Sequence, residues 1–364
     1  TFRTAEIIEL PNSGGNHSSP FITENTEYVV AGTRFSVPPD DANGDVPINT
    51  YKQNFKGTIS FISVAKENGA MDIAFQLQCP GVNFDLSRAG KGVSHGWFFF
   101  SMYNTEQANT LLEVNASQKD KDFIMAVNWK QAEEYIKAGK GRKQSVKYAH
   151  NVYSDITHSA TSTIKTEVTV LDVKDFKDLC YFFPCPKSPH GCDVSPTGEY
   201  IVGSGKLAAL IPVFSFDKLQ KAIAAKDYIG EFDGVPILKY ESVLYGEVKK
   251  PGLGPLHTEF DNKGYAYTSM FVSSEIVKWN IKDLKVVDRV PTYYSVGHLT
   301  VAGGDTKTPN GKYLVAYNKI TKDRYLPTGP ELSQSAQLYD ISGEKMQLIL
   351  DFPTIGEPHY AQIV

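Results

Sequence analysis

Strand-forming segments dominate the pattern of apolar and polar positions along this chain. Runs rich in apolar, β-branched and aromatic residues occupy residues 58–64, 71–77, 97–101, 124–127, 168–173 and 208–214. Clusters of Gly, Pro, Asn and Asp separate these runs at short intervals, which is typical of turns between short strands. The pattern therefore predicts a mainly β protein.

Two segments carry a helical pattern instead. Residues 128–138 place Trp129, Ala132 and Ile136 on one side and end at a glycine. Residues 216–226 follow Ser215, a residue type that favours helix N-caps, and carry an apolar stripe. We expect both helices to be excursions between strands and not separate domains.

A histidine recurs in the same local context at four places. Each is followed by a turn containing Gly, Asn or Pro and then by an aromatic-led strand; these histidines are His17, His190, His257 and His298. A supersecondary unit that recurs with a histidine in register should bring the imidazoles to equivalent positions in space. If the units surround an axis, the histidines converge there.

These features predict an all-β fold, a β-propeller with short helical insertions. The spacings from His190 through His257 and His298 to His359 are 67, 41 and 61 residues, which suit blades of about 40–45 residues with insertions. His359 should open another unit, but the chain stops at Val364. We expect residues 1–364 to form one propeller domain that is incomplete at both ends.

The composition argues against nucleic acid and membranes as partners. The net charge of −4 with mixed signs gives no reason to expect nucleic acid or an anionic membrane as partner. No apolar run approaches the roughly 20 residues of a membrane span. The basic stretch over residues 137–147 is interpreted as a solvated loop, because it lacks interleaved aromatic residues. The first residue is Thr1, so we expect an internal fragment.

The four cysteines do not form a zinc or disulfide pattern. Cys180 and Cys185 are too far apart for a CxxC motif, so Cys79, Cys180, Cys185 and Cys192 are expected to be buried or free thiols.

The recurring histidines point to a transition metal. Neutral imidazole suits zinc, copper, iron and nickel, and a shell without carboxylates disfavours calcium and magnesium. Several imidazoles exceed the needs of one tetrahedral zinc, which favours a multinuclear copper site. His95, His150 and His158 lack the repeated context and are expected to be structural.

Several local sequences resemble the propeller domain of the nitrous oxide reductase family. These are residues 188–192, 253–258, 277–280, 296–299, 318–324 and 357–359, and residues 14–21 resemble the form found in the family's second, Sec-exported clade. The resemblance spans the whole chain. It implies a seven-bladed propeller holding a four-copper sulfide cluster on histidines, with His17, His190, His257, His298 and His359 matching five cluster ligands.

The resemblance also says what this chain lacks. Two further ligands come from a paired-histidine motif upstream of His17, and a C-terminal cupredoxin domain with a binuclear copper centre would follow Val364. The resemblance implies a copper-dependent oxidoreductase that reduces nitrous oxide to dinitrogen and water, the last step of denitrification. The isolated fragment is expected to be inactive.

Further sites and partners are implied in the same way. Lys319 matches the family's active-site lysine, which could stabilise negative charge on oxygen. Tyr103, Glu106, the carbonyl of Val114 and Asp120 match a calcium site, in which Ser188 replaces a family Asn ligand. A second calcium site near Gln334 and Glu331 is doubtful by this comparison. The family implies a periplasmic location, a head-to-tail homodimer and an electron donor such as a cytochrome or cupredoxin.

Two other functions remain open from the sequence. A non-catalytic propeller scaffold predicts no recurring histidines and favours apolar or aromatic patches on one face. A metallo-propeller hydrolase would combine carboxylates with its histidines at the axis, but Glu259 and Glu357 follow no shared spacing.

Overall fold

Short strands make up most of this protein. The computed structural model describes residues 3–17, 21–40, 45–107, 121–154, 159–319, 334–354 and 358–361. Within these residues, 25 strands alternate with a few short helices. The mainly β prediction is therefore confirmed.

Three sheets are four-stranded antiparallel meanders in which strands follow one another in chain order. The first contains β12 (Pro189–Val194), β13 (Tyr200–Gly205), β14 (Leu210–Ser215) and β17 (Leu244–Lys249). The second contains β18 (Pro255–Phe260), β19 (Tyr265–Met270), β20 (Glu275–Asn280) and β21 (Val286–Pro291). The third contains β22 (Val296–Val301), β23 (Tyr313–Asn318), β24 (Ser335–Asp340) and β25 (Gln347–Pro353).

The other two sheets contain a similar antiparallel meander with extra strands on the outer edge. One runs in the order β1 (Glu6–Ile8), β9 (Arg142–Tyr153), β10 (Ala160–Asp172), β5 (Met71–Cys79), β4 (Gly57–Val64), β3 (Tyr28–Gly32) and β2 (Phe21–Ile22). The other runs in the order β15 (Tyr228–Phe232), β16 (Val235–Leu238), β11 (Cys180–Pro186), β8 (Lys121–Asn128), β7 (Trp97–Tyr103) and β6 (Asn83–Ala89). The added strands join through parallel pairs, β10 with β5 and β16 with β11.

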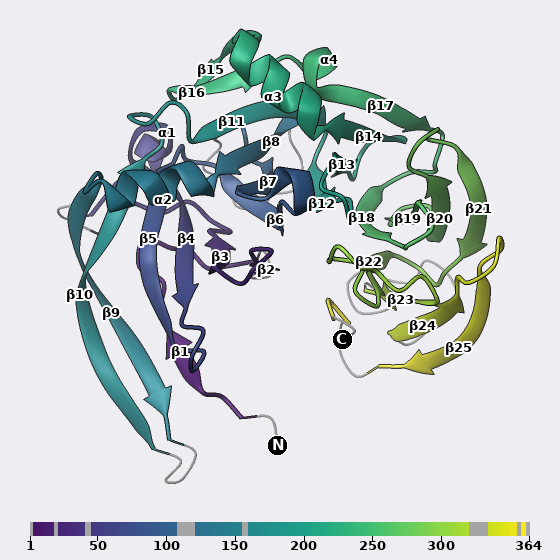
Figure 1. The fold of residues 1–364 in the computed structure, drawn as a ribbon, viewed down its shortest axis with the longest axis horizontal. Coiled ribbons are helices and arrows are strands. Elements are labelled where there is room, and N and C mark those ends of the chain that lie inside the picture. The colour runs from purple at the N-terminus through teal and green to yellow at the C-terminus, as the bar shows by residue number, and fades with distance from the viewer. Residues whose placement is uncertain are drawn as a thin grey trace.

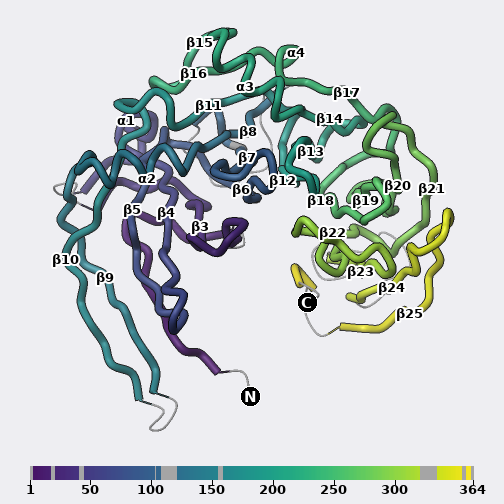
Figure 2. The backbone as a smooth tube through the Cα atoms, viewed as in Figure 1, coloured from purple at the N-terminus to yellow at the C-terminus, as the bar shows by residue number. Residues whose placement is uncertain are grey.

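The five sheets described follow one another around an open arc (Figure 1). The tube view shows the N- and C-terminal ends of the chain at the two ends of this arc (Figure 2). Strands β6, β12, β18 and β22 lie on its inner side, and each contacts the next. This radial arrangement of meanders is that of a propeller; the seven-bladed ring stays a prediction.

The helices lie between strands, as the sequence predicts. Helix α2 (Trp129–Lys137) begins after Asn128, whose side chain accepts a hydrogen bond from the Gln131 N–H. Helix α3 (Phe216–Ala225) begins after Ser215, which caps it in the same way, and ends in a left-handed residue. The remaining helices are single turns: η1 (Ile48–Thr50), α1 (Tyr51–Asn54), η2 (Gly92–Ser94) and α4 (Tyr240–Val243).

The core lies between the sheets, because the central strands are covered on both faces. All residues of β11, β12, β18 and β22 are buried. Strand β7 is nearly continuous in apolar residues, as expected of a strand buried on both sides. Trp279 on β20 is one of the largest fully buried side chains of this core, and its indole N–H donates a hydrogen bond to Thr268 Oγ1 at 2.9 Å.

One prediction about a local segment is wrong. The basic stretch over residues 137–147 is not a loop, because it leaves the end of α2 and continues as β9. Pairing with β10 along this strand overrides the polar composition. The cationic side chains still face solvent.

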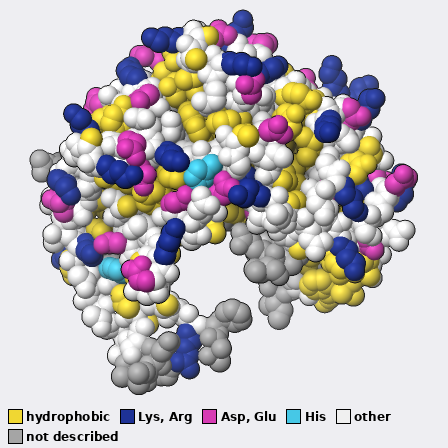
Figure 3. Space-filling view, in the orientation of Figure 1, with side chains coloured by type: hydrophobic (Ala, Val, Ile, Leu, Met, Phe, Trp, Pro, Cys, Tyr) yellow, Lys and Arg dark blue, Asp and Glu magenta, His cyan; other side chains and the backbone are white. Residues whose placement is uncertain are grey.

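The visible face carries charged side chains of both signs in a mixed distribution (Figure 3). An apolar patch lies over β25, where Leu348, Ile349, Leu350 and Phe352 are exposed. All four cysteines are buried free thiols, as expected. In the part of the chain that the structure describes, no helix is long and apolar enough to cross a membrane.

Candidate metal centre

Three of the predicted histidines occupy equivalent places on the inner strands. His190, His257 and His298 lie near the first residue of β12, β18 and β22. The pairing register of each strand shifts at its histidine, which marks a β-bulge or similar irregularity. Bulges re-aim side chains and are frequent beside functional sites. The sequence showed the repeat of histidine and turn, but it gave no sign of these irregularities.

The structure brings all five predicted histidines together. Ring centroids are 5.3 Å apart for His190 and His298, and 5.1 Å apart for His257 and His298. His359 lies 5.1 Å from His298 and 5.5 Å from His17, which lies 6.3 Å from His190. His190, His257 and His298 are buried, whereas His359 is exposed. His298 is therefore the centre of one continuous group drawn from distant parts of the chain.

Asp85 is a site residue that the sequence analysis missed. It lies on β6 and is buried, and its Oδ2 atom is 2.6 Å from Nδ1 of His190. Its Oδ1 atom is 2.9 Å from Nδ1 of His17. A carboxylate that accepts from one ring nitrogen fixes the tautomer of an imidazole and leaves the other nitrogen available to a metal. No repeat or motif in the sequence distinguishes Asp85 from the other acids.

Burial keeps the imidazoles of His190, His257 and His298 neutral. Desolvation lowers the pKa of His190 to about 3, although the nearby Asp85 opposes the shift. Desolvation also holds the pKa of His257 and of His298 well below the ordinary value, with a further lowering from neighbouring charged groups. The neutral imidazole is the form that binds a metal ion.

The donor set fits copper better than a hard cation. The Nδ1 atom of His298 is buried without a hydrogen-bond partner, and the Nε2 atoms of His190 and His298 are 3.4 Å apart. Imidazole nitrogen suits copper, zinc, iron and nickel. Nevertheless, among the described residues no group of three or more His, Cys, Asp or Glu side chains is arranged as it stands to hold a metal ion. The chemistry of these donors therefore fits copper, but their present arrangement among the described residues does not form a metal site.

His257 is the ring that is most engaged by protein. Its Nδ1 atom is 3.2 Å from the Leu299 backbone N–H. Its Nε2 atom contacts the guanidinium of Arg88, 2.5 Å from Nη2, and lies 3.3 Å from Asp193. Arg88 and Asp193 were not predicted as site residues.

The predicted catalytic lysine lies at the edge of the histidine group. Lys319 directly follows β23, and its Nζ atom is 3.1 Å from Nε2 of His359. Partial desolvation of the ring, and then the Lys319 cation at this distance, lower the pKa of His359 to about 4. The other charged residues near it in the chain, Lys322 to Arg324, lie outside the described residues.

The predicted calcium site cannot be assembled from the described residues. Val114 and Asp120 lie outside them, as does the side chain of Tyr103. Glu106 borders a cavity of about 470 Å³ whose lining includes Lys52. Ser188, which stands where the family has an Asn ligand, donates its backbone N–H to Asp122 at 2.9 Å. The calcium ligand set therefore stays a prediction.

The histidines set apart as structural lie elsewhere. His95 contacts Glu24 and Glu27 at 3.1 and 3.3 Å. His150 lies on β9, 3.9 Å from Glu6. His158 is outside the described residues.

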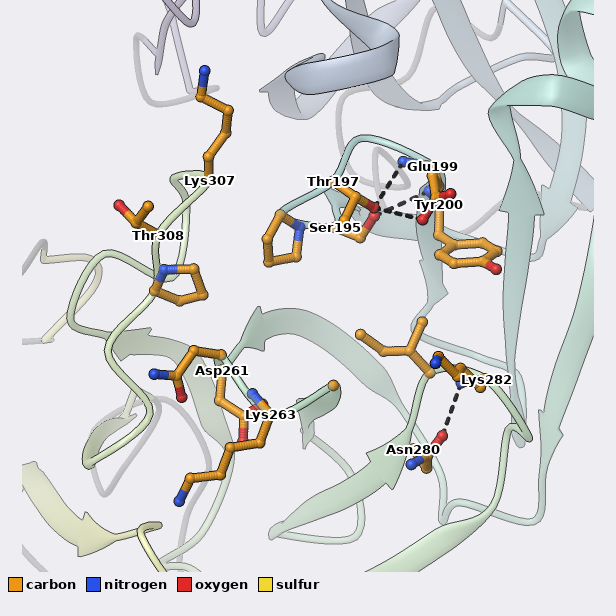
Figure 4. Close-up of a pocket in the computed structure, with 15 residues that line it drawn as sticks. Ser195, Thr197, Glu199, Tyr200, Asp261, Lys263, Asn280, Lys282, Lys307 and Thr308 are labelled. Atoms are coloured by element: carbon orange, nitrogen blue, oxygen red, sulfur yellow. Dashed lines mark hydrogen bonds between the residues drawn. The ribbon is translucent and has the colours of Figure 1, made fainter.

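A separate cavity of about 670 Å³ opens among the turns at the opposite ends of the inner strands (Figure 4). The turns after β12 and β18 line it, together with Asn280, Lys282 and the segment around Lys307. Because the histidines lie near the first residues of those strands, this cavity is distinct from the histidine group.

Known proteins resemble this chain along almost its whole length. The Nitrous-oxide reductase of Stutzerimonas stutzeri is 32% identical over 97% of this chain and 51% of its own length. That of Cupriavidus necator is 34% identical over 97% of this chain and 52% of its own length. Residues 289–359 match the family described as the nitrous oxide reductase propeller repeat. The resemblance inferred from the sequence is therefore confirmed.

The similarity covers only part of the relatives, and solved structures add little to it. The chain spans about half the length of the curated relatives it matches. The periplasmic gluconolactonase of Pseudomonas aeruginosa is a solved structure that covers 91% of this chain and 70% of its own, but at 11% identity and a TM-score of 0.44 it supports no conclusion.

Proposed function

Since the chain is homologous to nitrous-oxide reductases over 97% of its length, we propose that it is the propeller portion of an enzyme that reduces nitrous oxide to dinitrogen and water. The observation that carries this proposal is the group of five imidazoles around His298, three of them from strands of three different sheets. A non-catalytic scaffold gives no reason for neutral histidines to gather at bulges on successive inner strands.

In this proposal the histidines hold a four-copper sulfide cluster. The ligands from this chain are His17, His190, His257, His298 and His359. When bound, such a cluster supplies electrons to nitrous oxide, a weak ligand that is inert until it is reduced. The imidazoles bind without adding negative charge, which favours reduction of the site. Two further histidine ligands and a binuclear copper centre for electron entry would belong to the rest of the protein.

Asp85 orients two of the ligands. Its carboxylate accepts from Nδ1 of His190 and lies against Nδ1 of His17. Both rings then carry their proton on Nδ1 and leave Nε2 unprotonated, which is the tautomer that binding requires. Burial opposes ionisation of Asp85, but its interactions with His190 and His17 and the nearby Lys206 cation hold the pKa of this carboxyl well below its ordinary value.

Lys319 supplies charge and a proton at the edge of the site. The overall reaction consumes two electrons and two protons for each nitrous oxide, so the oxygen must be protonated before it leaves as water. The Nζ atom of Lys319 lies 3.1 Å from Nε2 of His359, and this position beside a proposed ligand supports a role in stabilising negative charge on the oxygen and in protonating it.

The similarity to nitrous-oxide reductases supports several proposals about the whole protein. It would be a seven-bladed propeller enzyme of the periplasm and a head-to-tail homodimer, supplied with electrons by a cytochrome or a cupredoxin. A calcium ion held by Tyr103, Glu106, Val114 and Asp120 would tie loops beside the copper site. The domain assignment, residues 1–364 as propeller with a cupredoxin domain beyond them, belongs to this proposal.

The test is nitrous oxide-dependent oxidation of a reduced electron donor by the full-length protein. We expect turnover by the wild type and none by His298→Ala, because His298 contacts three of the other four rings. A full-length, copper-loaded wild type that does not consume nitrous oxide contradicts the proposal.

A further inference from the structure

Arg88 lies at the centre of a buried charged cluster beneath the histidines. It is on β6 and is only 2% exposed. Its Nε atom is 3.1 Å from Asp193 on β12 and 2.9 Å from Asp305 in the segment after β22. Its Nη2 atom is 3.8 Å from Glu259 on β18 and 3.2 Å from the Tyr360 hydroxyl. One guanidinium thus connects four separate parts of the arc.

The same Nη2 atom contacts the Nε2 atom of His257. On the other side of that ring, the backbone N–H of Leu299 points at Nδ1 at 3.2 Å. Both ring nitrogens are therefore approached by N–H donors, and Nε2 also lies 3.3 Å from Asp193 and 3.7 Å from Glu259, whose oxygens could accept a proton carried on Nε2. A neutral imidazole has only one acceptor nitrogen, so it can accept from one of the two donors only.

We expect His257 to accept from the Arg88 guanidinium and not from the Leu299 N–H. Hydrogen bonds from a guanidinium are stronger than those from a neutral amide, and Nη2 of Arg88 contacts Nε2 of His257 directly. The proton of His257 then resides on Nδ1, and Nε2 keeps its lone pair. Without Arg88, the Leu299 N–H would take Nδ1, and the proton would move to Nε2.

We propose that Arg88 is a positioning residue for His257, a placeholder that keeps its Nε2 unprotonated until a copper ion replaces the guanidinium. This inference rests on the proposed function for the identity of the metal. It accounts for a ring whose two nitrogens are both approached by protein donors, and which sequence resemblance places among the copper ligands.

Acidic and hydroxyl groups around Arg88 can bind its guanidinium after it leaves His257. Its Nε atom lies within ion-pair distance of Asp193 and Asp305, and these carboxylates can keep the guanidinium in place when Nη2 turns away from His257. Glu259 lies 3.8 Å from that atom, and the Tyr360 hydroxyl, which donates to Asp305 at 2.8 Å, lies 3.2 Å from it. Arg88 therefore keeps most of its partners when it yields Nε2.

The test is the tautomer of His257 in the metal-free full-length protein. Histidine labelled with ¹⁵N distinguishes protonated from unprotonated ring nitrogens through their long-range couplings to the ring carbon-bound protons, and His257→Asn assigns the signal. We expect an unprotonated Nε2 and a protonated Nδ1 in the wild type. The opposite tautomer overturns the proposal, and this result needs no variant of Arg88.

Two variants then isolate the guanidinium. In Arg88→Met the His257 signals should shift to those of the tautomer with the proton on Nε2. The control is Arg289→Lys, which changes an ion pair with Glu275 away from the histidines and should leave the His257 signals unchanged. A folded Arg88→Met protein with His257 signals identical to the wild type shows that Arg88 only supports the fold.

Addition of Cu(I) alone separates this inference from the proposed function. We expect the Nε2 signal of His257 to shift on addition of Cu(I), and at a lower Cu(I) concentration in Arg88→Met than in the wild type. If the other four histidines respond and His257 does not, the placeholder role is wrong while copper binding stands. If no histidine responds, the proposed function is wrong, and the tautomer comparison still decides whether Arg88 positions His257.

Discussion

The Nδ1 atom of His190 and the Oδ2 atom of Asp85 lie 2.6 Å apart, although the residues are 105 positions apart in the sequence. The pair joins β12 of one sheet to β6 of the next, and both side chains are buried. Because the same carboxylate also reaches His17, one acid orients two of the proposed metal ligands.

We predict that Asp85→Asn weakens copper binding. Loss of a carboxylate that orients a metal-binding histidine typically costs about 10–100-fold in affinity. Copper stoichiometry and competition with a chelator measure the effect in the full-length protein. The matched control is Asp233→Asn, which removes the carboxylate of a surface ion pair with Lys56. Equal copper retention by both variants would show that Asp85 does not support the site.

A second prediction concerns Lys319→Met. Its copper content should match the wild type, because the lysine is not proposed as a ligand, while turnover should fall by about 10²–10⁴-fold, the range for a group that transfers a proton in the rate-limiting step. Lys312→Met, at an exposed residue before β23, is the control. Wild-type turnover in Lys319→Met would remove the lysine from the mechanism.

The metal-free protein should lose stability at mildly acidic pH. Burial lowers the pKa of His190 to about 3 in the folded state, whereas the unfolded chain protonates near the ordinary value of about 6.5. Between these values the unfolded state binds more protons, so the free energy of unfolding falls as the pH falls, by up to about 1.4 kcal/mol for each pH unit from this group.

Denaturant unfolding from pH 7.5 to pH 4.5 measures this slope. His190→Gln, which lacks the titrating ring, should show a smaller slope than the wild type, and His95→Gln, at a more exposed histidine beside Glu24 and Glu27, serves as the control. A His190→Gln slope equal to that of the wild type contradicts the assignment of a buried, neutral ring.

The core between the first and second meanders offers a test of the fold. Trp279 on β20 is fully buried and donates to Thr268, so Trp279→Ala should lower the free energy of unfolding by about 3–5 kcal/mol. Val287→Ala on the exposed outer strand β21 should change it by less than about 1 kcal/mol. Equal effects in the two variants would contradict the packing described.

The sequence predicts more of the fold than of the site. Both helices follow from their apolar stripes and caps at Asn128 and Ser215, since capping is a local property. The outer additions to the first two sheets do not follow, because the pairs of β10 with β5 and of β16 with β11 join distant strands. The basic residues that begin β9 carry no local sign of a strand.

At the site, the repeated sequence pattern identifies the histidine ligands but not the residues that hydrogen-bond to them. His190, His257 and His298 recur in register with a turn, so the sequence brings them together. Asp85 and Arg88 occur once each on β6 and act on histidines contributed by other sheets. Only the packing of one sheet beside the next reveals such partners.

The central claim is that imidazoles from different sheets bind a copper–sulfide cluster. Metal analysis combined with determination of acid-labile sulfide in the purified full-length protein tests it most directly. We predict copper and sulfide together in the wild type and loss of both in His298→Ala. Zinc or calcium alone, with neither copper nor acid-labile sulfide in the wild type, would contradict the account.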